Sequence, residues 1–153
     1  MGVIMKHEEL ENKRKKVIMG NKLEEYLIKQ NKDLVACNKY VSNGVILVSK
    51  HILKNKLLLA YKTREKDLLE TIDLPFEQGE EWELPNSVEL GSFGKKYFVF
   101  NEKYRFDYDY IKLFHSVYYL SIEFYIVWLC NAPVLKVFID DNFAGVIMPA
   151  KIN

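Results

Sequence analysis

The chain has 153 residues, of which 49% are hydrophobic, and it carries 22 Lys and Arg against 21 Asp and Glu. This length and balance are typical of a single globular domain that needs no disulfide or metal to hold it together. Its two cysteines, Cys37 and Cys130, lie in apolar runs without a partner at metal-ligand spacing, which excludes a disulfide framework and favours buried free thiols.

No segment predicts secretion or insertion into a membrane. The apolar run near the start covers only Val3 to Met5, whereas a secretory signal needs about 7–15 apolar residues. The most apolar later stretch, 118–130, contains Glu123 and is shorter than the about 20 residues that cross a bilayer. We therefore expect a cytoplasmic protein without a membrane partner.

The net charge of +1 hides two blocks of opposite sign. Residues 12–66 contain 14 Lys and Arg against 4 Asp and Glu, whereas residues 67–94 contain 8 acidic residues and no Lys or Arg. Such blocks can pair with each other in the fold, solvate two surfaces or steer a charged partner, which for the basic block is nucleic acid. The densest basic cluster consists of four consecutive residues: Lys13, Arg14, Lys15 and Lys16.

Residues 1–20 predict a basic helical arm in front of a single α+β domain that covers residues 21–153. Residues 7–16 are polar and compatible with a helix, and residues 16–20 fit either its last turn or a short strand.

A second helix is predicted to start at Asn21 and to end by residue 31. Asn21 is a favourable N-cap, and Glu24 three residues later completes a pattern similar to a capping box. The apolar side chains of this segment fall on one face of a helix: Leu23, Tyr26 and Leu27.

Three strands are predicted next. Residues 34–41 and 45–53 are rich in β-branched and apolar side chains, and Asn43-Gly44 between them favours a type I′ turn and therefore a hairpin. Residues 57–61 predict a third strand. Residues 63–72 are compatible with either a helix or an extended segment.

Proline, glycine and acidic residues indicate a loop over residues 75–94, with one short strand at 87–90 and a tight turn at 91–94. Residues 97–100 predict another strand. Its aromatic side chains favour burial in the core over stacking on bases.

The last third of the chain predicts one helix followed by three strands. Residues 107–117 have apolar side chains at helical spacing. Three apolar segments follow, with Asp140-Asp141-Asn142 as the turn before the last one: 119–129, 134–139 and 143–148. The chain therefore predicts an α+β fold, an antiparallel sheet with two or three helices, and no internal repeat is visible in the sequence.

No constellation of residues predicts catalysis. The three histidines, His7, His51 and His115, have no His, Cys or carboxylate partner at a recognised metal spacing, and no glycine-rich phosphate loop or activated nucleophile is present. We therefore expect a protein that is not an enzyme, with no cofactor, metal ligand or catalytic residue. A site assembled from dispersed residues, for instance His51, His115 and Asp140, is the alternative.

The C-terminal segment resembles the closing hairpin of bacterial and phage-type DNA sliding clamps, the ring proteins that tether DNA polymerase. In that family a helix and a strand precede an apolar strand that begins with proline, a short acidic turn and a last strand. The last strand ends in a hydrophobic-Met-Pro-x-basic-hydrophobic tail, and residues 147–152 (IMPAKI) fit this tail. Weaker similarities occur at residues 40–48, with their Asn-Gly turn, and at residues 82–88 around Pro85.

The resemblance covers about residues 34–153 and implies a single clamp-like domain that associates with DNA or the replication machinery, encoded by a phage or mobile element. Because a clamp protomer has three such domains, a closed ring implies a homo-oligomer; otherwise the domain serves another role. In clamps, basic helices contact the phosphates of duplex DNA without reading sequence. The corresponding candidates here are Lys13, Arg14, Lys15, Lys16, Lys22 and Lys29.

A second surface is implied beside the C-terminal tail, where clamps bind short peptides of replication proteins. The residues placed there by the resemblance are Met148, Pro149 and Ile152. An interaction or inhibitor protein is the alternative function, in which the acidic residues of 67–89 mimic DNA and bind a nucleic-acid enzyme of the host.

Overall fold

The computed structural model describes residues 21–62, 79–129 and 131–151. The predicted basic arm over residues 1–20 and the ambiguous segment 63–72 lie outside these ranges. Within the described residues the fold is α+β and mostly antiparallel, as predicted.

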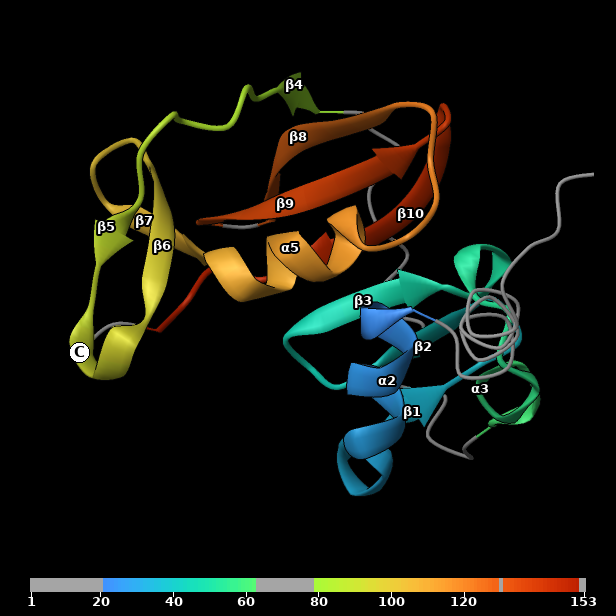
Figure 1. Cartoon of the computed structure of the whole chain (residues 1–153). Helices are drawn as coiled ribbons and strands as arrows, with labels where there is room; N and C mark the ends of the chain where they lie inside the picture. Colours follow the sequence, from blue (N-terminus) through green and yellow to red (C-terminus); the bar gives the residue numbers. More distant parts are fainter. Residues whose placement is uncertain (1–20, 63–78, 130, 152–153) are drawn as a thin grey trace, which may run out of the picture.

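The main layer is a seven-stranded antiparallel sheet in the order β1-β2-β3-β10-β9-β8-β4 (Figure 1). Its strands in chain order are β1 (Val35–Ala36), β2 (Tyr40–Ser42), β3 (Ile46–Ser49), β4 (Glu80–Glu81), β8 (Ile122–Leu129), β9 (Ala132–Ile139) and β10 (Asn142–Ile147). The three predicted C-terminal strands are therefore confirmed, with starts and ends shifted by up to three residues.

Alternation of side chains explains how β9 fits the sheet. Leu135, Val137 and Ile139 point toward the helices and are almost fully buried, whereas Lys136 points to the opposite face. The turn to β10 is the predicted one. Asp140 and Asp141 have φ angles of 50° and 65°, the left-handed pair that a two-residue hairpin with matching twist requires.

The two halves of the sheet repeat one unit, a helix followed by three antiparallel strands. Helix α2 (Lys22–Lys29) precedes β1-β2-β3, and helix α5 (Tyr108–His115) precedes β8-β9-β10. The last strands of the two units pair antiparallel, with Val48 opposite Gly145 and Ile46 opposite Ile147. The connectivity therefore has an internal two-fold repeat, which is not visible in the sequence because the two units share no common sequence pattern.

The two helices contact each other on one face of the sheet, and the start of α2 meets the end of α5 (Figure 1). The backbone N–H of Leu23, at the start of α2, donates to Ser116 Oγ at the end of α5 over 3.3 Å. The rings of Tyr26, in the middle of α2, and Tyr110, in the first turn of α5, are 5.8 Å apart. One hydrophobic core fills the space between this helix pair and the sheet.

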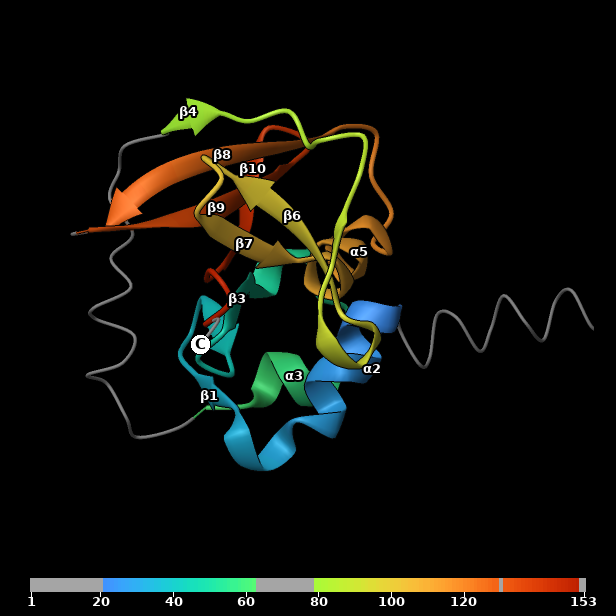
Figure 2. The same ribbon diagram turned by 90° about the vertical axis from the view of Figure 1, so that its left-hand side faces the viewer.

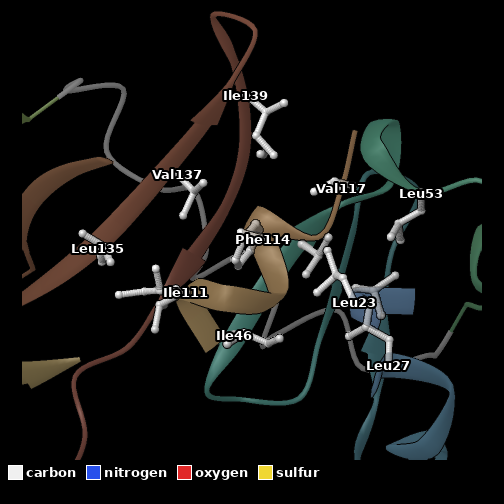
Figure 3. Packing of buried hydrophobic residues seen from close by; sticks show 14 of the residues in the cluster. Leu23, Leu27, Ile46, Leu53, Ile111, Phe114, Val117, Leu135, Val137 and Ile139 are labelled. Carbon is white, nitrogen blue, oxygen red and sulfur yellow. The ribbon is translucent and has the colours of Figure 1, made fainter. Parts of the chain in front are cut away.

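Figure 3 shows that this core takes side chains from both units. Leu23 and Leu27 of α2 and Phe114 of α5 are completely buried. Helix α5 comes especially close to β10 at Gly145, because a Cβ atom at that position would lie 2.6 Å from Phe114 Cζ. The absence of a side chain at Gly145 therefore allows the helix to reach the sheet.

A second, three-stranded antiparallel sheet lies beside the first (Figure 1) and consists of β5 (Glu89–Leu90), β6 (Lys96–Phe100) and β7 (Tyr104–Asp107). An aromatic cluster joins the two sheets. The ring of Phe100 is 5.5 Å from that of Trp82 and 6.2 Å from that of Trp128 on β8. Short 3-10 helices complete the described fold: η1 (Asn31–Asp33), η2 (Lys50–Ile52) and η3 (Ser92–Gly94).

Three predicted strands differ from the structure, and a further strand was not predicted. Residues 45–53 are extended only over β3, because residues 50–52 form η2. Residues 34–41 are not one strand, because a turn at 37–39 divides them into β1 and β2. Residues 57–61 are not a strand: α3 (Lys56–Ala60) is helical and is capped by Asn55, whose side chain accepts from Leu57 N–H. Strand β7 was not predicted, since its turn places Asn101 and Glu102 at φ angles of 51° and 59°, which Glu seldom adopts.

The helix start at Asn21 and the turn at Asn43-Gly44 lie where they were predicted, but their hydrogen bonds and backbone angles differ from the predicted ones. Asn21 caps α2 through Glu24 N–H, but the Glu24 carboxylate does not return to its own helix; it accepts from the N–H groups of Lys54 and Asn55. The turn at Asn43-Gly44 is not type I′, because only Gly44 has a positive φ. The Asn43 side chain instead accepts from the N–H groups of Val45 and Ile46.

Candidate nucleic-acid interface

The outward sides of α2 and α5, together with the start of β6, form a surface that carries exposed lysines and is called the helix face here. Its members come from three elements and are Lys22 and Lys29 on α2, Lys112 on α5 and Lys96 on β6. Glu25 and Asp109 are the exposed carboxylates on the same two helices. Lysines therefore outnumber acidic side chains on this face.

Tyr108 connects two of these lysines. The Nζ atoms of Lys96 and Lys112 lie 5.7 and 5.8 Å from the centroid of its ring. A cation at this distance is attracted by the ring quadrupole, so Tyr108 keeps two positive charges close together on the helix face. One of the two comes from β6 and the other from α5.

The neighbouring Lys95 is held in place by an ion pair at the start of α5. Its Nζ lies 3.4 Å from Asp107 Oδ2, and the Asp107 carboxylate raises the pKa of Lys95 above its usual value. Asp107 also caps α5 by accepting from Asp109 N–H over 2.8 Å. The positive charge of Lys95 is therefore partly offset by the Asp107 carboxylate.

The predicted acidic block does not pair with the basic block among the described residues. Glu89 pairs with Arg105 of the same small sheet, and this hydrogen bond lowers the pKa of Glu89 and raises that of Arg105. Glu80, Glu81 and Glu83 are exposed. They lie on and after β4, at the edge of the main sheet farthest from α2 (Figures 1 and 2), so the two charges are separated in space.

The predicted DNA-binding residues are only partly described. Lys22 and Lys29 are the first and last residues of α2 and lie about two turns apart on the same exposed side, on the helix face. Lys13, Arg14, Lys15 and Lys16 lie outside the described residues. Lys112 and Lys96 were not among the predicted DNA-binding residues. The spacing of Tyr108 and Lys112 on one helix side was a usable signal, but Lys96 joins them only through the tertiary structure.

The predicted partner-binding residues lie on a tail that is fixed to the body of the protein. Met148 N–H donates to Val45 O over 2.9 Å, and Ala150 N–H donates to Arg105 O over 2.7 Å. Met148 is 39% exposed and Pro149 is half-buried, whereas Ile152 lies outside the described residues. The tail therefore bridges the main sheet and the small sheet.

The dispersed residues considered for catalysis have separate structural roles. Asp140 Oδ1 accepts from the N–H groups of Leu120 and Ser121, and His115 Nδ1 lies 2.9 Å from the Tyr119 hydroxyl. His51 is exposed on η2. Within the described part of the chain, no three His, Cys, Asp or Glu side chains gather as metal ligands.

Comparison of the chain with models of known protein families, with curated proteins and with solved structures gave no match. Among the described residues, no helix has the length and apolar character needed to cross a membrane.

Proposed function

We propose that this protein is a non-catalytic, clamp-like cytoplasmic protein that binds duplex DNA through the helix face without reading its sequence and serves the replication machinery. One observation supports it above the others. Two helices that contact each other lie on one face of a continuous sheet and present Lys22, Lys29 and Lys112 to solvent, with Lys96 beside Lys112. Lysines in such an arrangement neutralise backbone phosphates.

The separation of charge favours one orientation on DNA. The exposed acidic side chains of β4 and the following loop, Glu80, Glu81 and Glu83, lie away from α2. A polyanion is repelled by this edge and attracted by the helix face, so encounter with DNA is steered to one side. The resemblance of residues 147–152 to the clamp tail is the reason for assigning the protein to replication.

Binding is tested by fluorescence anisotropy with a labelled duplex of about 20 base pairs at several salt concentrations. We expect tight binding at low salt that weakens steeply as salt rises, because counterions are released from neutralised phosphates. The triple variant Lys22→Glu/Lys29→Glu/Lys112→Glu should abolish binding. A matched control with the same charge change, Lys39→Glu/Lys56→Glu/Lys103→Glu, alters exposed lysines outside the helix face and should bind. Equal losses in both variants, or no binding by the natural chain at low salt, would contradict the proposal.

The mass of the protein in solution, with and without the duplex, tests the assembly that the clamp resemblance implies. A ring requires a homo-oligomer on the DNA. A monomer that binds the duplex instead indicates a clamp-like domain that acts singly.

A second function is favoured by the acidic edge. Glu80, Glu81 and Glu83 are exposed, and no cation pairs with them within the described residues. Such a row of carboxylates resembles the charge of a DNA backbone, as an inhibitor of a DNA-binding protein requires. Charge reversal, Glu80→Lys/Glu81→Lys/Glu83→Lys, should then abolish capture of that protein in a pull-down, and unchanged capture would remove this function.

A further inference from the structure

The tip of the β5–β6 hairpin carries the most exposed apolar side chains of the small sheet. Phe93 is fully exposed, at 103% of its reference surface, and Leu90 is 75% exposed. Large aromatic side chains normally bury most of their surface, so a Phe in this position contributes nothing to the core. Gly91 N–H donates to Lys95 O over 2.8 Å and closes the turn that presents it.

The backbone at the tip holds Phe93 in an unfavourable conformation. Its φ and ψ angles are 59° and 32°, in the left-handed region that bulky residues rarely adopt. Gly94, the next residue, also has a positive φ of 75°. Strain at a residue that gains no packing in return is typical of positions retained for recognition.

The tip lies near the part of the helix face that α5 forms. Figure 1 places the β5–β6 turn on the side away from β8 and β9, near the start of α5 and at the opposite end of the view from α2. Two lysines follow the tip directly in the chain, and one of them, Lys96, shares the Tyr108 ring with Lys112 of α5. The apolar tip is therefore adjacent in the chain to Lys96, one of the lysines proposed to hold DNA phosphates.

We infer that Leu90 and Phe93 form an apolar wedge that inserts between base pairs of DNA bound on the helix face. Proteins that bend DNA use apolar side chains of this kind to separate adjacent base pairs, while neighbouring cations hold the phosphates. Here Lys96 supplies the cation next to the wedge. This inference rests on the proposed function, because the helix face has to bring the duplex to the tip.

The experiment compares Leu90→Ala/Phe93→Ala with Leu57→Ala/Leu120→Ala, a control that removes two equally exposed leucines elsewhere. Affinity is measured by anisotropy, and bending is measured by energy transfer between dyes at the two ends of the duplex. We expect the tip variant to bind about tenfold more weakly and to lose the bend. Its dependence on salt should stay unchanged, because every lysine is retained. The control should match the natural chain in both measurements.

The outcomes separate this inference from the function on which it rests. Salt-sensitive binding by the natural chain together with unchanged affinity and bend in the tip variant overturns the wedge and leaves the proposed function standing. Absence of any binding by the natural chain overturns both. A third arm uses sedimentation with vesicles that contain anionic lipid. Loss of vesicle binding in the tip variant, with DNA binding unaffected, assigns the tip to a lipid surface and overturns the wedge.

Discussion

At the scale of single residues, Glu24 shows how a local motif is used for a long-range contact. The side chain is 1% exposed, and its two oxygens accept from the N–H groups of Lys54 and Asn55 over 3.0 and 2.8 Å. The carboxylate therefore joins α2 to the segment that starts α3. Glu24→Ala leaves these donors without their partner and should lower the free energy of unfolding by about 2 kcal/mol in urea titrations.

The adjacent Glu25 provides the control for this prediction. It lies on the same helix but is exposed, so Glu25→Ala should change the free energy of unfolding by less than about 0.5 kcal/mol. Similar losses in both variants would show that only helix propensity or helix charge is involved, and that the contact across to α3 contributes nothing.

His115 makes stability depend on pH. Burial lowers the pKa of His115 below its ordinary value, and its ring packs against Tyr119 and Phe124. The unfolded chain therefore binds the proton more readily than the folded one. The contribution of neutral His115 to folding stability is complete above the pKa of the unfolded state, about 6.5. It is lost as the pH falls through that value toward the lower pKa of the folded state. In thermal melts from pH 7.5 to 5.5, His115→Gln should show a smaller fall in Tm than the natural chain.

At the scale of elements, the contact between α5 and β10 depends on Gly145. An added Cβ would approach both Phe114 Cζ and the carbonyl oxygen of Leu47, which belongs to the backbone of the neighbouring strand. Gly145→Ala should therefore lower the free energy of unfolding by about 3 kcal/mol, measured in urea. Gly44→Ala is the comparison, because an added Cβ at Gly44 meets no atom but the backbone has a φ of +90°. This substitution should lower the free energy of unfolding by about 1 kcal/mol. An equal or smaller loss at Gly145 would mean that the helix has room to move away.

The elements that were predicted correctly are those whose signals are local. The three C-terminal strands follow from apolar runs and a turn of two aspartates, and α5 follows from its apolar spacing. Helix α3 was mistaken for a strand because its short apolar run fits either element and the cap at Asn55 was not recognised. The ammonium of the buried Lys50 donates to the carbonyl oxygens of Leu59 and Tyr61, at the end of that helix.

The candidate site was predictable to a similar extent. Lys22 and Lys29 share one side of a helix with recognisable caps, so the sequence places them together. Lys96 lies on β6 and reaches the same face only because the small sheet packs beside α5. The exposed Phe93 was not predicted either, since neither its burial nor its positive φ can be inferred from a Gly-Ser-Phe-Gly turn.

At the scale of the whole molecule, the two helix–three-strand units share one core and should unfold together. Leu27 belongs to the first unit, yet it is buried in the same cluster as Ile111 and Phe114 of the second. Both tryptophans, Trp82 and Trp128, follow the first unit in the chain, so their fluorescence reports on the second half while far-UV circular dichroism reports on all of it. The two urea transitions should coincide. Leu27→Ala should move both to lower urea by the same amount, a loss of about 3 kcal/mol. A shift of the dichroism transition with the fluorescence transition unmoved would show instead that the first unit unfolds independently.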